Sequence, residues 1–297
     1  MNIGIGVPAN IPGVRGQLLL DWARQVEAGP FSSLSIIDRL VYPNYEPLIT
    51  LAACAGATQR VRLVTSVLLA PLRNTALLAK QAASIDALSN GRLTLGLGIG
   101  GREDDFRAAS VSFKDRGRRF EEQLTLMRRI WSGQPLGDGI GAIGPTPIRK
   151  GGPAVLIGGY SPAAVRRVGR WGDGYIAGGG TIEQAAELYR AAEASWKAEG
   201  RAGRPRFVGA FYFGLGPNAL ERASASMRDY YAFMGPMVEG MIRSLPTTPE
   251  AVEQAIQARL AIGMDEVIAW PCIAELDQIN RLAQVVNKIA GLQAAPA

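Results

Sequence analysis

The stretch GRLTLGLGIGG, residues 91–101, has the pattern of a buried strand that runs into a cluster of glycines. Gly96, Gly98 and Gly101 also match the G-x-G-x-x-G spacing of dinucleotide-binding turns. That fingerprint normally lies in the first strand-to-helix turn, whereas three strand–helix units precede it here. Three carboxylates follow at positions 103–105 and would repel a pyrophosphate. The glycines are therefore interpreted as leaving room at a strand end for a bulky planar ligand.

Similar apolar runs recur along the whole chain and alternate with helical patterns such as Leu78, Ala82 and Ile85. Alternating strands and helices imply parallel pairing through right-handed crossovers, and eight such units most economically close into a barrel. The sequence predicts an α/β protein formed by one (β/α)8 TIM barrel domain over residues 1–297. The predicted strands are residues 2–7, 33–37, 61–69, 92–99, 154–158, 174–177, 207–215 and 266–270.

Two connections of this barrel are predicted to be expanded. Residues 133–152, after the fourth strand, are rich in glycine and proline, and residues 233–248, after the seventh, contain two prolines and two threonines. Such insertions account for a length of 297 residues, because a barrel of this type typically needs roughly 250.

The composition excludes several kinds of chemistry. The chain contains no histidine, which rules out Ser-His-Asp or Cys-His catalysis, histidine-ligated metals and imidazole proton transfer. Its two cysteines, Cys54 and Cys272, are too few for a zinc cluster, so no metal site is expected. The remaining candidates are carboxylates, tyrosine, lysine, arginine, backbone groups or a cofactor.

The charge pattern and hydropathy limit the partners. The net charge is +6, but the arginines are interspersed with acidic residues and form no basic stripe, so no nucleic acid is expected. No apolar run reaches the roughly 20 residues needed to span a bilayer. The first residues, MNIGIGVP, lack the pattern of a secretory signal, so we expect a cytoplasmic protein without a membrane partner.

Two further glycine clusters follow the predicted fifth and sixth strands, and each opens a helix. In a barrel these helix N-termini lie side by side, where free amides, small hydroxyls and two helix dipoles can hold a phosphate. Either cluster alone is also explained by an ordinary turn, but the pair favours a phosphorylated cofactor. The candidate cofactor-binding residues are Gly158, Gly159, Tyr160 and Ser161 in the first cluster and Gly178, Gly179, Gly180 and Thr181 in the second.

Three segments carry a family resemblance over essentially the whole chain. They are PLRNTALLAKQAASIDALSNGRLTLGLGIGGREDDF, IGGYSPAAVRRVGRWGDGYIAGG and DEVIAWP. In this order they resemble the bacterial luciferase-like family of flavin-dependent oxidoreductases. The resemblance implies a barrel, usually dimeric, that binds reduced FMN or the related deazaflavin cofactor at the carboxyl ends of its strands. It also implies that the two glycine clusters hold the cofactor phosphate.

The resemblance further implies that the flavin ring packs against the end of the third strand. That region is Thr65-Ser66-Val67 here, and relatives often have a bulge with a cis non-proline peptide at this place. Ser66 and Val67 are therefore added to the candidate cofactor-binding residues.

One departure from the family concerns catalysis. Many relatives have a histidine at the end of the second strand, where this chain has Ile37, Asp38 and Arg39. Asp38 is a candidate acid or base if burial raises its pKa, but pairing with Arg39 or another cation would keep it ionised and structural. Arg39 is a candidate for holding an anionic reduced flavin or a substrate carboxylate.

Aromatic residues near strand ends are candidates for the wall of a substrate pocket. Tyr42 follows the second strand, and Trp270 closes the eighth. Of Tyr212 and Phe213, only one can face the barrel interior, because side chains alternate along a strand. The segment 230–233, with three aromatic residues, fits either a mobile wall or an interface between subunits.

The leading hypothesis is a flavin-dependent monooxygenase that uses reduced FMN and O2 to oxygenate a small organic substrate. A separate flavin reductase would supply the reduced FMN, and a homodimer is expected from the resemblance. The alternatives are a deazaflavin-dependent dehydrogenase or reductase on the same barrel, and a flavin-binding protein without catalytic activity.

Overall fold

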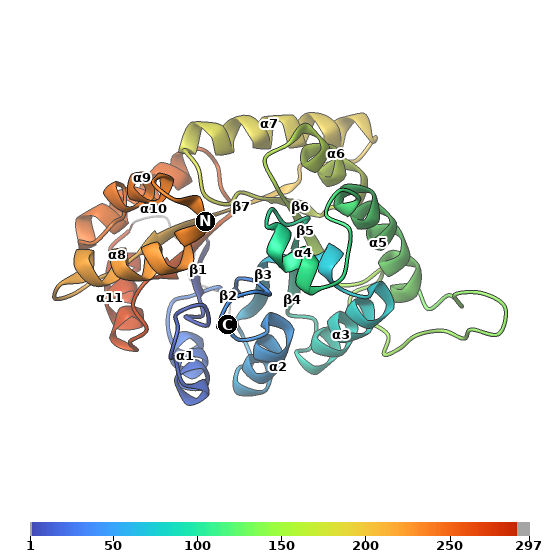
Figure 1. The fold of residues 1–297 in the computed structure, drawn as a ribbon, viewed down its shortest axis with the longest axis horizontal. Coiled ribbons are helices and arrows are strands. Elements are labelled where there is room, and N and C mark those ends of the chain that lie inside the picture. The colour runs from blue at the N-terminus through green and yellow to red at the C-terminus, as the bar shows by residue number, and fades with distance from the viewer. Residues whose placement is uncertain (1, 290–297) are drawn as a thin grey trace.

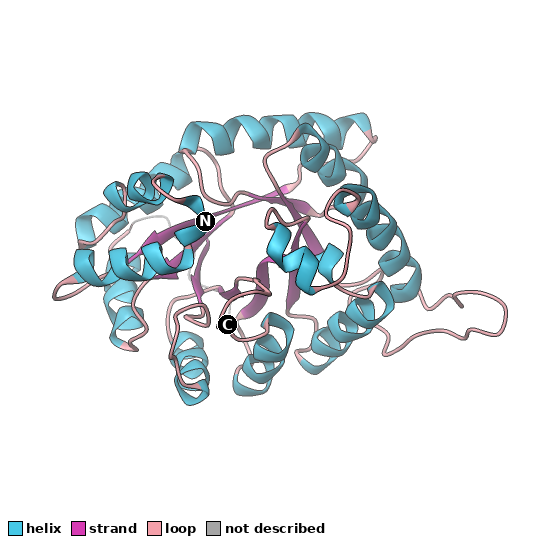
Figure 2. Cartoon of the chain, in the orientation of Figure 1, coloured by secondary structure: helices cyan, strands magenta, loops and turns pink. Residues whose placement is uncertain are grey.

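Eight parallel strands close into a barrel in the computed structural model, which describes residues 2–289 (Figures 1 and 2). Each strand pairs with the next along the chain, and β1 pairs with β8 to complete the ring. The predicted barrel is confirmed, with each strand end within two residues of its expected place. The strands are β1 (Asn2–Gly6), β2 (Ser33–Ile36), β3 (Arg62–Leu69), β4 (Leu93–Gly98), β5 (Ala154–Gly158), β6 (Gly174–Ile176), β7 (Arg206–Phe213) and β8 (Glu266–Pro271).

Helices surround the barrel, and polar residues mark where several of them begin. Asn74, Ser161, Thr181 and Thr248 each accept the amide hydrogen of the residue three positions later, as N-caps do. The helices are α1 (Gly16–Ala28), α2 (Pro47–Ala57), α3 (Thr75–Leu88), α4 (Glu103–Ala108), α5 (Arg116–Trp131), α6 (Pro162–Trp171), α7 (Ile182–Ala198), α8 (Ala219–Tyr230), α9 (Met237–Arg243), α10 (Pro249–Ala261) and α11 (Asp277–Val286), with short 3-10 helices η1 (Ala70–Leu72) and η2 (Ala232–Met234).

The apolar core has two layers, because each strand buries both of its faces. The larger layer lies between the strands and the helices and includes Trp22, Phe120 and Phe207. The smaller layer fills the barrel itself and includes Val64 and Trp270. A Cβ on Gly6 would overlap the ring of Trp270, so glycine is required there for the indole to lie across the barrel.

A buried carboxylate ties four strands together at the amino-terminal end of the barrel. Glu266 of β8 is 1% exposed and accepts hydrogen bonds from the hydroxyls of Ser32 at 2.5 Å and Ser33 at 2.7 Å. It also pairs with Arg62 of β3 at 2.9 Å and with Arg206 of β7. Burial alone would raise the pKa of Glu266, but the two guanidinium groups and the hydroxyls hold this pKa below 4.5. The carboxylate therefore stays charged inside the barrel.

Both expanded connections are present. The chain between α5 and β5 projects from the ring of helices as a long loop (Figure 1), with one antiparallel bridge between Gly137 and Ile140. The connection between β7 and β8 contains α8, η2, α9 and α10. Among residues 2–289, no helix combines the length and apolar character that crossing a bilayer would need.

Replacing Glu266 by glutamine should destabilise the barrel strongly. The variant Glu266→Gln leaves Arg62 and Arg206 without their shared counter-charge, and we expect the free energy of unfolding to fall by about 3 kcal/mol. Chemical denaturation at pH 7 measures this change. The control Asp277→Asn breaks an exposed ion pair with Arg281 and should cost less than about 0.5 kcal/mol. Equal losses in the two variants would contradict the role of Glu266.

The contribution of Glu266 should depend on pH in a defined direction. Because its pKa is lower in the folded state than the ordinary 4.5, its stabilising effect is complete above that value and is lost as the pH falls through the folded-state pKa. The difference in unfolding free energy between the native chain and Glu266→Gln should be largest near pH 7 and should shrink below pH 4.5. A difference that stays constant down to pH 3 would contradict this assignment.

Candidate functional site

Two adjacent cavities open at the carboxyl ends of the strands. The larger cavity, of about 530 Å³, lies over the ends of β3, β4 and β5. The smaller cavity, of about 240 Å³, is lined from β2, β6, β7 and β8 and from the expanded connection between β7 and β8. Ser66 and Gly178 line both cavities. A ligand in one cavity would therefore touch the wall of the other.

The end of β3 forms the boundary between the cavities. The register between β3 and β4 shifts between Thr65 and Leu68, and the peptide bond between Ser66 and Val67 is cis. The bulge and the cis non-proline peptide expected from the family resemblance are both present. Val67 lines the larger cavity, and the site therefore has an apolar side chain at the place where a flat ring was expected.

The glycines of residues 91–101 make room for this bulge. A Cβ at Gly96 would overlap the carbonyl oxygen of Thr65, and one at Gly98 would lie 2.7 Å from a methyl carbon of Val67. Gly158 on β5 is equally close to Val67, at 2.8 Å for such a Cβ. Gly96 and Gly98 thus leave room for the bulge of β3 itself. The room for a bulky planar ligand expected here stays a prediction, with Gly98, Gly100 and Gly101 lining the larger cavity.

The two glycine clusters lie next to each other, as expected for neighbouring strands. The hydroxyl of Tyr160 donates a hydrogen bond of 2.7 Å to the carbonyl oxygen of Gly179, which links the loop after β5 to the loop after β6. Gly159 and Gly180 adopt φ values of 137° and 123°, which favour glycine. Both loops lead into the N-termini of α6 and α7, the helix ends that carry partial positive charge.

The cap residues of those helices already have partners. Ser161 accepts from the amide of Ala164, and Thr181 accepts from the amide of Gln184, each at 3.2 Å. Ser161 lines the larger cavity, whereas Thr181 lines neither cavity. Residues 158–161 therefore offer the more direct phosphate site, and their assignment to the cofactor stays a prediction.

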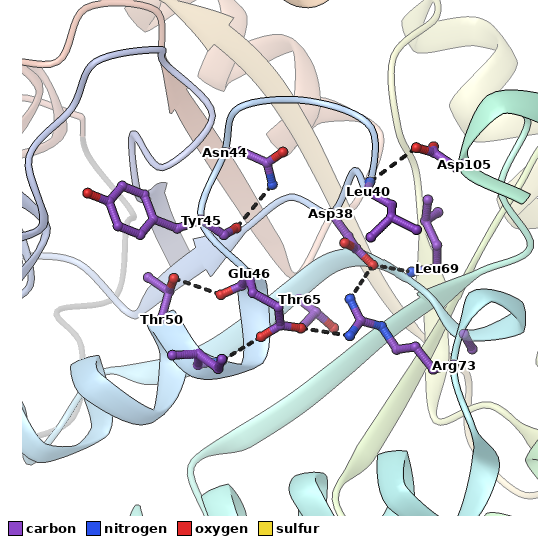
Figure 3. Close-up of polar contacts among 12 residues, drawn as sticks. Asp38, Leu40, Asn44, Tyr45, Glu46, Thr50, Thr65, Leu69, Arg73 and Asp105 are labelled. Atoms are coloured by element: carbon purple, nitrogen blue, oxygen red, sulfur yellow. Dashed lines mark hydrogen bonds and ion pairs between the residues drawn. The ribbon is translucent and has the colours of Figure 1, made fainter. Parts of the chain in front are cut away.

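Asp38 pairs with Arg73, not with its neighbour Arg39. Its carboxylate is 3.0 Å from a guanidinium nitrogen of Arg73 and accepts the amide hydrogen of Leu69 at 2.9 Å (Figure 3). Arg73 also pairs with Glu46 at 2.6 Å. Asp38 lines neither cavity. Of its two expected roles, this geometry favours the structural one, in which Asp38 fixes the chain that follows β3.

Arg39 stacks among aromatic rings. Its guanidinium carbon lies 4.3 Å from the ring centre of Tyr42 and 5.3 Å from that of Tyr230, and it donates to the carbonyl oxygen of Tyr230 at 2.7 Å. Arg39 joins the loop after β2 to the end of α8 and does not line either cavity. Its expected contact with an anionic ligand therefore stays a prediction.

Asp105 holds the same loop from the other side, which the sequence did not indicate. It is fully buried and accepts the amide hydrogens of Leu40 at 3.2 Å and Val41 at 2.7 Å (Figure 3). Only its place in the first turn of α4 could be inferred from the sequence, because the contact joins residues 65 positions apart.

The smaller cavity has an aromatic and sulfur-rich wall. Tyr212 faces the barrel interior, while Phe213 packs under the helices, as the alternation along β7 requires. The hydroxyls of Tyr212 and Tyr231 lie 2.6 Å apart. Burial raises the pKa of Tyr212 far above 10 and that of Tyr231 to about 12, so both phenols stay protonated at neutral pH.

Several residues of this cavity were not expected from the sequence. Met241, Ser244 and Pro246 belong to the expanded connection, whose composition signalled an insertion but gave no sign of which side chains turn inward. Arg259 comes from α10, where nothing in the sequence distinguished it from other helical arginines. Within residues 2–289, no group of three histidine, cysteine or acidic side chains is arranged to hold a metal ion.

Comparison with known proteins identifies the family. The model of the luciferase-like monooxygenase family matches residues 1–293. The chain belongs to this family. The luciferase-like family comprises flavin- and F420-dependent oxidoreductases, which include monooxygenases and dehydrogenases. The resemblance seen in the sequence is thus confirmed, and so is the enzyme class at the level of the family.

Two curated relatives of this luciferase-like chain are each 32% identical over 54% of it. One is an uncharacterised protein of Mycobacterium tuberculosis, of which 65% is matched. The other is the F420-dependent glucose-6-phosphate dehydrogenase of Nocardia farcinica, of which 50% is matched. The chain therefore spans less than two thirds of the length of either relative.

Solved structures share the fold at low identity. The monooxygenase RslO1 from Streptomyces bottropensis has a TM-score of 0.81 at 20% identity, covering 96% of this chain and 97% of that one. An F420-dependent secondary alcohol dehydrogenase has a TM-score of 0.80 at 16% identity, covering 96% and 98%. A monooxygenase and an F420-dependent dehydrogenase thus share this fold, and the fold alone does not select between their reactions.

Replacing Gly159 should weaken cofactor binding. A side chain in Gly159→Val meets the Cβ of Ala164 at 2.8 Å and is strained at φ 137°, so the amides of residues 158–161 must shift. We expect the dissociation constant of the cofactor, measured by titration of apo-protein, to rise by about tenfold or more. The control Gly203→Val replaces a glycine that also has a positive φ but has open space around it. It should leave the dissociation constant unchanged, whereas an unchanged value in Gly159→Val would contradict the phosphate assignment.

Proposed function

We propose that this protein is an F420-dependent oxidoreductase that transfers a hydride between the deazaflavin cofactor and a small organic substrate. The cofactor would occupy the larger cavity, and the substrate would occupy the smaller one. Sequence similarity supports this order of preference, because a 32% identical relative is an F420-dependent glucose-6-phosphate dehydrogenase and others are named phthiodiolone/phenolphthiodiolone dimycocerosates ketoreductases.

The observation that carries the proposal is the charge of the larger cavity. Among the described residues, its lining contains no Asp, Glu, Lys or Arg. A phosphate held there would rely on backbone amides, hydroxyls and the dipole of α6. FMN carries a phosphate monoester with a charge of about −1.5 to −2 at neutral pH. The phosphate of F420 is a diester, which has a single charge, and a neutral site accommodates such a group at lower electrostatic cost than a monoester.

The surroundings of the larger cavity fit a flat ring with a phosphorylated chain. Val67 offers an apolar surface at the bulge of β3. Gly98 and Gly158 have no side chain that would collide with Val67 from the neighbouring strands. Residues 158–161 would hold the phosphate. When bound, the deazaflavin supplies or accepts the hydride.

The protein's own contribution is to orient the substrate and exclude water. Ile37, Trp270 and Met227 present apolar surface to the smaller cavity. The paired phenols of Tyr212 and Tyr231 line the same cavity. A protonated hydroxyl of Tyr231 can donate a hydrogen bond to a carbonyl or alcohol oxygen. The chain contains no histidine that could take this role.

The FMN-dependent monooxygenase expected from the sequence is the second candidate. It is favoured by the pairing of Asp38 with Arg73, which removes the one carboxylate expected to move protons. A reaction in which the cofactor and O2 supply the chemistry needs less from side chains. Under this alternative a separate reductase would deliver reduced FMN. A flavin-binding protein without catalytic activity ranks third, because a second cavity that shares Ser66 with the first favours a substrate beside the cofactor.

Titration of the purified apo-protein with F420 and with FMN separates these candidates. We expect the dissociation constant for F420 to be lower than that for FMN by about tenfold or more, followed by spectral changes of F420 when a substrate alcohol or ketone is added. Tighter binding of FMN, with O2 uptake above the rate of free reduced FMN and an oxygenated product, would establish the second candidate. Binding of neither cofactor would overturn both.

A further inference from the structure

An arginine forms part of the outer wall of the smaller cavity. The side chain of Arg259 runs back along α10, and one guanidinium nitrogen donates to the carbonyl oxygen of Ala255 at 2.8 Å. Its Nε donates to the carbonyl oxygen of Ala210 on β7 at 3.3 Å, and its guanidinium carbon lies 5.0 Å from the ring centre of Phe211. The guanidinium is thus fixed in place at the cavity wall.

No acidic residue neutralises this charge. Among residues 2–289, no ion pair joins Arg259 to a carboxylate, and its second terminal nitrogen is accessible and has no hydrogen-bond partner within the protein. Burial lowers the pKa of Arg259 to about 10, with no opposing acidic group. Burial also lowers the pKa of Arg206, but there Glu266 opposes the shift. A partly buried charge without a partner is unfavourable, and a bound anion would relieve that cost.

The loop that precedes a helix N-terminus lines the same cavity. The backbone of Gly178, Gly179 and Gly180 forms part of its wall and leads into α7, whose N-terminus carries partial positive charge. Ser244 contributes a hydroxyl from the expanded connection. Arg259 and the loop of residues 178–180 that precedes α7 therefore line one cavity, although they lie about 80 positions apart in the sequence.

The rest of the lining is mainly apolar or aromatic and includes Ile37, Trp270, Met227 and Met241. The cavity is thus amphipathic. We propose that the smaller cavity binds a substrate with an apolar body and an oxyanion group, a carboxylate or a phosphate, that pairs with Arg259. This inference rests on the proposed function, because it assigns the larger cavity to the cofactor and the smaller to the substrate.

The oxyanion could also belong to the cofactor, and the two sources predict different effects of replacing Arg259. Arg259 does not line the larger cavity, where residues 158–161 would receive the cofactor phosphate. If Arg259 serves the substrate, its replacement changes substrate affinity and leaves cofactor affinity unchanged. If it serves the cofactor, the reverse holds.

The test uses hexanoate and 1-hexanol, which share a six-carbon body and differ in charge, as probes for the full-length protein. Calorimetric titration at pH 8 measures both dissociation constants for the native chain, Arg259→Met and Arg259→Lys. Arg259→Met keeps much of the apolar stem, and Arg259→Lys keeps the charge. The control Arg201→Met removes another partly buried guanidinium, which donates to backbone carbonyls and stacks on Trp196 outside both cavities.

We expect the native chain to bind hexanoate at least about tenfold more tightly than 1-hexanol, and Arg259→Met to lose this preference. Arg259→Lys should keep part of it, and Arg201→Met should keep all of it. Thermal unfolding checks that each variant is folded. If Arg259→Met does not fold, the inference is tested by the preference of the native chain and of Arg259→Lys for hexanoate. No preference in the native chain, or an unchanged preference in Arg259→Met, would overturn the inference.

F420 and FMN titrations of the same variants separate this inference from the proposed function. Reduced cofactor affinity in Arg259→Met with an unchanged preference for hexanoate would assign the arginine to the cofactor and overturn the inference. A preference for hexanoate that depends on Arg259, in a protein that binds neither cofactor, would support the anion site and refute the proposed function.

Discussion

The packing of the β3 bulge against glycines of β4 and β5 determines where ligands can enter this barrel. Val67 occupies the space above Gly98 and Gly158, and any larger residue at those two positions would push the bulge out of place. Because Ser66 lines both cavities, the bulge also sets their common wall. The local backbone of three strands thus fixes the boundary between two cavities whose other walls come partly from long connections.

Several buried charged residues stabilise the fold and do not line either cavity. Glu266 is compensated by two arginines at the amino-terminal end of the barrel, and Asp38 and Asp105 hold the chain around the carboxyl ends of β2 and β3. Arginines such as Arg92 donate to backbone carbonyl oxygens that end strands and helices. Arg259 also donates to backbone carbonyl oxygens, but it differs from Arg92 in lining a cavity.

The order of strands and helices could be predicted from sequence periodicity because burial on both faces of a parallel strand leaves continuous apolar runs. The two glycine clusters were also placed correctly beside each other, since neighbouring barrel strands end at one face. The partner of Asp38 could not be found, because Arg73 lies 35 positions away and Arg39 was adjacent. Nor could the direction of Arg259, because helical spacing gives the position of a residue but not the course of a long side chain.

The hydrogen bond from Tyr160 to Gly179 connects the surroundings of the two cavities. It fastens the loop that would receive the cofactor phosphate to the loop that forms one wall of the neighbouring cavity. A cofactor that settles first would immobilise that wall and complete the surface on which the second ligand packs. Binding in the larger cavity and binding in the smaller one would thus be coupled through this single contact between two loops.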